Sequence, residues 1–155
     1  MSDLKGLVLA IELATRQRDQ AVATLLKARQ TCHAVQDQMG QLESYSRETE
    51  SHWALGSRTS ANPEAVWHYD HFMERLQQAV ELQQDVVHEH LQALEADRQQ
   101  VMAAEVRMAA LKRLLHKRQT TRLRVQARQE TKQLDELAAM QFRRLHANSE
   151  TMGTP

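Results

Sequence analysis

The chain has 155 residues with only four glycines, two prolines and 4% aromatic residues, which excludes a turn-rich sheet protein and disfavours a compact globular core. Its 41% of hydrophobic residues, interleaved with Gln and Arg, is typical of long helices. The formal net charge of zero conceals a separation of charge, because residues 61–105 carry two basic and nine acidic side chains whereas residues 106–155 carry eleven basic and four acidic ones.

A long first helix is predicted over about residues 3–52. Apolar residues recur every seven positions in two series, which begin at Leu4 and Leu7 and continue to residue 42 with one polar interruption at Arg18. Such heptads indicate a coiled coil, in which a stripe of the helix packs against a second helix along a seam. Three successive alanines in the second series predict a close approach of the two helices. They are Ala14, Ala21 and Ala28.

A connector is predicted over about residues 54–62, where Gly, Ser, Asn and Pro gather. Asn62 as the N-cap, Pro63 in the first turn and Glu64 beside it predict the start of a second helix, which runs to about residue 146. We expect the two helices to form a single domain, residues 1–147, followed by a flexible tail at residues 148–155.

The second helix carries its own heptads, with seven apolar residues at one phase from Met73 to Leu115. The accompanying series is partly polar and contains Gln83, His90 and Asp97. A single short connector makes the helices antiparallel. The predicted fold class is therefore all-α, a long antiparallel two-helix coiled coil (an α-hairpin) with the second helix longer than the first. We expect a monomer, because the two arrays satisfy each other.

The second helix is longer than its partner can cover. Folding back near residue 58 places Leu4 opposite about residue 112, so the chain beyond Leu115 has no partner helix within the chain. The same stretch is basic, and residues 107–132 contain Glu130 as their one acidic residue. An amphipathic basic helix without a partner is an interaction element. Its basic residues include Arg113, Lys117, Arg118, Arg122, Arg124 and Arg128.

Catalytic chemistry is not expected. The sequence has no Gly-rich phosphate loop, HExxH or GxSxG motif, and two packed helices are not expected to form a pocket of ligand size. We predict no catalytic, cofactor-binding or metal-binding residues. His68 and His71 share a helix face but lack a third ligand for zinc, and Cys32 falls on the seam. One cysteine, no signal peptide and no membrane-spanning apolar run favour the cytoplasm.

Two features of the sequence allow more than one interpretation. The basic stretch fits a solvated face, a nucleic-acid contact, an anionic membrane or docking onto an acidic protein surface. Nucleic acid is disfavoured because the acidic segment upstream would repel phosphates, and a membrane because the apolar face carries only scattered Leu, Val and Ala, so docking onto an acidic protein is favoured over both. Five aromatic residues flank the connector, either pinning the helices together or forming an exposed anchor patch. They are Tyr45, Trp53, Trp67, Tyr69 and Phe72.

The order of motifs resembles the FliJ family, a small coiled-coil component of the bacterial flagellar type III export apparatus. The motifs are a Leu-x4-Glu-Leu-Ala-x3-Arg-Asp-x-Ala pattern at residues 7–21, Gln-Leu-Glu-Ser-Tyr at residues 41–45, a Trp/Tyr/Phe segment opening the second helix, and Glu-Thr-Lys-Gln-Leu-Asp-Glu-Leu-Ala at residues 130–138. The resemblance covers about residues 4–146. It implies a non-enzymatic, stalk-like coiled coil at the inner-membrane export apparatus.

Family members bind and stimulate the hexameric export ATPase, contact the cytoplasmic domain of the export-gate membrane protein, and in some cases escort export chaperones. The resemblance assigns the basic residues above to the ATPase. It assigns gate binding to Gln38, Leu42, Tyr45, Phe72, Leu76 and Ala79. Thr49 and Gln83 depart from the aromatic residue and histidine expected in that patch, and Leu42 and Leu76 also fall on the seam.

Two alternatives to this function stay open. The chain could be the equivalent stalk, scaffold or adaptor of a virulence secretion system, or, from another class, a basic coiled-coil nucleic-acid-binding protein. Stimulation of the ATPase favours the flagellar stalk, whereas salt-dependent binding of duplex DNA by residues 107–146 favours the nucleic-acid binder.

Overall fold

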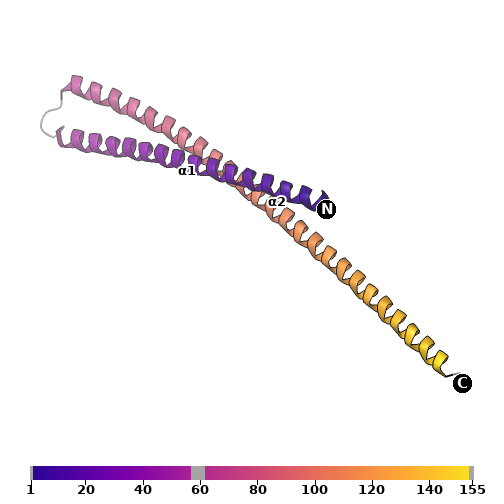
Figure 1. Cartoon of the computed structure of the whole chain (residues 1–155). Helices are drawn as coiled ribbons and strands as arrows, with labels where there is room; N and C mark the ends of the chain where they lie inside the picture. The colour runs from indigo at the N-terminus through magenta and orange to yellow at the C-terminus, as the bar shows by residue number, and fades with distance from the viewer. Residues whose placement is uncertain (1, 57–61, 154–155) are drawn as a thin grey trace. The chain divides into compact units, whose positions relative to one another are not determined.

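The computed structural model describes residues 2–56 and 62–153. Within them the chain forms two α-helices and no strand: α1, Ser2–Gly56, and α2, Pro63–Met152 (Figure 1). The predicted fold class, an α-hairpin with a longer second helix, is confirmed. Asn62 caps α2 as expected, since its side-chain Oδ1 accepts a hydrogen bond from the amide of Glu64 at 3.3 Å and its carbonyl accepts one from Val66 at 3.1 Å.

Both helices end later than the sequence predicts. α1 continues to Gly56, so residues 54–56 of the expected connector are helical, and residues 57–61 of it lie outside the described residues. The added residues before Gly56 are Trp, Ala and Leu, which do not break a helix.

The expected flexible tail is also largely helical, because α2 continues to Met152. The hydroxyl of Ser149 donates to the carbonyl of His146 at 2.8 Å, and that of Thr151 donates to the carbonyl of Ala147 at 3.1 Å. These bonds satisfy side chains that would otherwise compete with the helix, and the first glycine after the connector is Gly153.

The chain divides into two compact units. The hairpin unit is Leu13–Arg107, and the terminal unit is Met1–Glu12 together with Met108–Pro155. Each unit contains a part of α1 and a part of α2.

The seam of the hairpin unit follows the predicted heptads. Its buried residues are Ala14, Leu25, Cys32 and Val35 of α1 with Leu76, Val80 and Val101 of α2. The remaining heptad residues of this unit are half-buried, including Arg18 and Asp97. The helices run antiparallel, since Cys32 meets His90 whereas Trp53, later in α1, meets Tyr69, earlier in α2. The seam prediction is therefore confirmed.

The polar seam positions find partners across the seam. Gln83 Nε2 donates to the backbone carbonyl of Val35 at 2.9 Å and to Gln38 Oε1 at 3.3 Å. Cys32 Sγ donates to the backbone carbonyl of His90 at 3.1 Å. Since a carbonyl oxygen has two lone pairs, these acceptors keep their helical bonds, and Gln83 and Cys32 avoid the cost of unsatisfied polar groups.

In the terminal unit the same pattern ends. Leu7 is buried, and Leu4, Leu111 and Leu115 are half-buried, as their heptad positions predict. Thr120 is the last half-buried residue of α2, and every residue from 121 to 153 is exposed. No described helix has an apolar stretch long enough to cross a bilayer.

We predict that Leu76→Ala lowers the free energy of unfolding by about 2 kcal/mol or more, because it opens a cavity beside a buried seam residue. The matched control is Leu82→Ala on the same helix, whose leucine is 67% exposed against 8% for Leu76; we expect a change of at most about 0.5 kcal/mol. Denaturant unfolding followed by circular dichroism measures both. Equal losses in the two variants would contradict this register of the seam.

Candidate partner-binding surfaces

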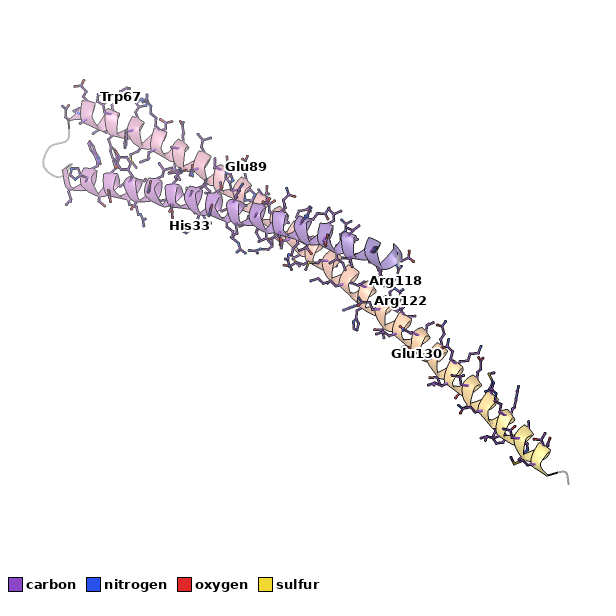
Figure 2. The ribbon with its side chains drawn as sticks, viewed as in Figure 1. His33, Trp67, Glu89, Arg118, Arg122 and Glu130 are labelled. Atoms are coloured by element: carbon purple, nitrogen blue, oxygen red, sulfur yellow. The ribbon has the colours of Figure 1, made fainter. Side chains whose placement is uncertain are left out.

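The largest solvent-facing part of the terminal unit is the exposed segment, residues 121–153, which comprises the end of α2 and Gly153. α1 begins at Ser2, and beyond that point no second helix lies beside α2, as Figure 2 shows past Arg122 and Glu130. Strong helix formers and the absence of Gly and Pro before Gly153 favour the helix locally. A helix of this length with both polar and apolar residues in water has an uncovered interaction face.

The basic residues expected to bind the ATPase all lie on exposed positions of α2 in the terminal unit. Like charges occupy helix positions four apart in three pairs: Arg113 with Lys117, Arg118 with Arg122, and Arg124 with Arg128. Each such pair destabilises an isolated helix by roughly 0.2–0.5 kcal/mol. None of the six has an ion-pair partner among the described residues. An acidic surface would relieve this repulsion.

An apolar groove of about 420 Å³ also lies in the terminal unit, where the first turns of α1 meet α2. Its α1 wall contains Leu4, Val8 and Leu9, and its α2 wall contains Leu115 and Gln119. Two cations, Lys5 and Arg122, stand at its edge. Heptad spacing did not predict this groove, although Val8 and Leu9 gave a signal, since they are apolar but lie off the heptad series.

The aromatic residues of the hairpin unit differ in how far their rings are covered. Trp53 of α1 stacks on Tyr69 of α2 with ring centroids 4.4 Å apart, and both are half-buried, so this pair pins the helices together. Tyr45 and Phe72 meet edge to face at 6.0 Å but remain 52% and 40% exposed. They form an apolar surface that bridges α1 and α2 and is open to a partner.

The residues assigned to gate binding are brought together in the hairpin unit but differ in accessibility. Gln38, Tyr45 and Phe72 are exposed, Leu42 and Ala79 are half-buried, and Leu76 is buried at 8% exposure. Gln83 is hydrogen-bonded to Gln38 beside them. Because Leu76 belongs to the seam, its side chain is buried between the helices and offers little surface to a partner.

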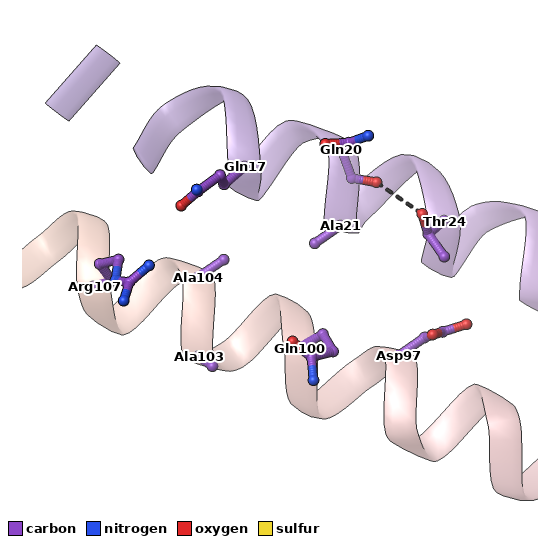
Figure 3. A pocket seen from close by; sticks show the side chains of 9 residues that line it. All are labelled: Gln17, Gln20, Ala21, Thr24, Asp97, Gln100, Ala103, Ala104 and Arg107. Atoms are coloured by element: carbon purple, nitrogen blue, oxygen red, sulfur yellow. Dashed lines mark hydrogen bonds between the residues drawn. The ribbon is translucent and has the colours of Figure 1, made fainter. Parts of the chain in front are cut away.

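A hollow of about 660 Å³ opens in the hairpin unit where Ala21 of α1 faces Ala104 of α2 (Figure 3). One expectation is wrong here, because the seam does form a space of ligand size. Ala21 and Ala104 line this space with small side chains, and both residues are half-buried. Its other walls are Gln17, Gln20, Thr24, Asp97, Gln100, Ala103 and Arg107.

The histidines near the start of α2 contact an indole ring. The ring of Trp67 lies 4.1 Å from that of His71 and 5.1 Å from that of His68, and His71 Nδ1 is 4.0 Å from a carboxylate oxygen of Glu74. The part of the chain that the structure describes has no group of three or more His, Cys, Asp or Glu side chains that could hold a metal ion.

Comparison with known proteins identifies a family. The family model described as flagellar FliJ protein matches residues 5–146. No curated protein and no solved structure matches the chain. The match spans α1 and nearly all of α2, including the exposed segment up to residue 146. The chain therefore belongs to the FliJ family and is a coiled-coil protein related to flagellar export.

Proposed function

We propose that this protein is a non-enzymatic, stalk-like component of the flagellar export apparatus, which binds and stimulates the hexameric export ATPase and connects it to the membrane export gate. The observation that carries the proposal is the exposed basic stretch of α2 in the terminal unit, in a chain whose family acts in flagellar export. A stalk requires stiff helices, surfaces for two partners and no catalytic site of its own.

The terminal unit is the surface proposed for the ATPase. Its basic residues carry unrelieved repulsion, so contacts with acidic side chains of a ring would stabilise both partners. A helix that lies asymmetrically within a ring touches some subunits and not others. It favours one subunit conformation over another only through that difference in contacts, which is how it would raise turnover.

The hairpin unit carries the surface proposed for the gate protein. Tyr45 and Phe72 supply exposed aromatic area on two helices that the seam holds in place. Such preorganised aromatic anchors contribute most of the binding energy in many interfaces. The separate location of the two surfaces allows one copy of the chain to engage both partners on the cytoplasmic side of the inner membrane. Escort of export chaperones is part of this proposal, with no residues assigned to it.

We predict that reversing three charges, Arg118→Glu, Arg122→Glu and Arg124→Glu, lowers stimulation of the export ATPase about tenfold at low salt. The reason is that each reversal turns attraction to an acidic surface into repulsion, and rising salt should weaken stimulation by the wild-type chain as well. ATP turnover with and without the chain, at several salt concentrations, measures the effect.

The matched control for these reversals changes Arg16→Glu, Lys27→Glu and Arg29→Glu, three exposed cations of α1 in the hairpin unit that lie outside both assigned surfaces. It should retain stimulation close to that of the wild type. Equal losses in both variants, or stimulation that is insensitive to salt, would contradict the proposed surface. The chain alone should hydrolyse no nucleotide.

We predict that Tyr45→Ala together with Phe72→Ala weakens binding to the cytoplasmic domain of the gate protein at least about tenfold, because anchor aromatics commonly contribute about 2 kcal/mol or more. ATPase stimulation should stay unchanged. The control is Trp67→Ala, which removes a more exposed ring, at 58%, from outside the assigned patch. Calorimetric titration compares the variants, and loss of both partners by one variant would rule out separate surfaces.

A further inference from the structure

Three leucines of the exposed segment form a stripe that repeats every eleven residues, whereas the seam repeats every seven. Leu123, Leu134 and Leu145 follow one another at intervals of eleven residues and are 66%, 66% and 70% exposed. At about 100° per residue, eleven residues end about 20° from three full turns, so these leucines lie along one line of α2. Ala127 and Leu137 lie within about 60° of this line.

This stripe continues the apolar groove of the terminal unit. Leu115 and Gln119 line the groove. Leu123 comes four residues after Gln119 and so lies on the same helix face. The apolar surface therefore extends from Leu4, Val8 and Leu9 of α1 along α2 to Leu145. At about 100° per residue, a seven-residue repeat and an eleven-residue repeat each drift about 20° per repeat but in opposite directions, so a partner helix on the stripe would wrap around α2 with the opposite hand from the seam.

The charges around the stripe define what can cover it. Arg122 and Arg124 lie about 100° to either side of the Leu123 line, whereas Arg118, Arg128 and Lys132 lie on the far half of the helix. A helix seated on the stripe would meet cations on both flanks beside Leu123, whereas beside Leu134 one flank carries Asp135. Glu130, in contrast, lies within about 20° of the line and interrupts it with an exposed carboxylate (Figure 2).

We infer that the stripe and the groove together form a docking track for a partner helix with an apolar stripe, acidic flanks and one basic residue opposite Glu130. The inference rests on the proposed function for the identity of the partner, the export ATPase, and adds the chemistry of the contact. Covering Glu130 without a counter-charge would be costly, so the basic residue sets the register of the two helices. A second copy of the chain fits poorly, because its own flanks are basic.

The test uses synthetic helices in place of the ATPase, so it stands even if the ATPase assay fails. The probe is a fluorescent peptide with Leu at eleven-residue spacing, Glu on both flanks and one central Lys. Anisotropy titrations with the full chain should show binding that Leu134→Ser weakens at least tenfold, since a buried leucine contributes that much affinity. Exchanging the flanking Glu residues for Lys should abolish binding.

The matched control is Met140→Ser, which removes an exposed apolar side chain, 55% exposed against 66% for Leu134, about 120° away from the stripe. It should bind the peptide as the wild type does. Glu130→Leu should weaken the original peptide yet bind more tightly to a peptide with Leu in place of the central Lys. Equal effects of Leu134→Ser and Met140→Ser, binding indifferent to flank charge, or self-association through the stripe in sedimentation would each overturn the inference.

Discussion

A helix in a coiled coil is buried only where a second helix lies beside it, and most features of this protein follow from that constraint. α1 supplies the second helix from Ser2 onward, and α2 is 90 residues long against 55 for α1. Where both are present, the heptad residues are buried or half-buried, and Gln83 and Cys32 form hydrogen bonds across the seam. Where α1 is absent, from residue 121, every described residue is exposed, and leucines and arginines share one uncovered helix.

The seam could be predicted in full because heptad spacing is a property of one helix alone. The sequence therefore located Leu76, Val80 and Val101 as buried residues, and it located Asn62 as the cap of α2. It could not predict the hollow at Ala21 and Ala104, because the space between two helices depends on the side chains of both and no pattern within one helix encodes it.

Among the proposed site residues, the sequence placed the basic ones correctly on exposed positions of α2, because charge and the length difference between the helices suffice for that conclusion. The sequence alone could not show which aromatic rings pack between the two helices and which stay exposed. That division depends on which ring finds a partner: Trp53 is covered by Tyr69, whereas Tyr45 and Phe72 meet only at their edges and stay accessible. Leu76 shows the same limit, since a single residue can belong to a resemblance-based patch and yet be buried in the seam.

The central claim is that the exposed segment of α2 is covered only when another protein binds to it. Hydrogen–deuterium exchange of backbone amides, resolved along the sequence, tests it most directly, because uncovered helices open locally with little cost in free energy. In the free chain, amides of residues 121–152 should exchange much faster than those of residues 13–56 and 63–107, and the export ATPase should slow exchange in the first range alone. Equal protection of both ranges in the free chain, or no change when the ATPase is bound, would contradict the account.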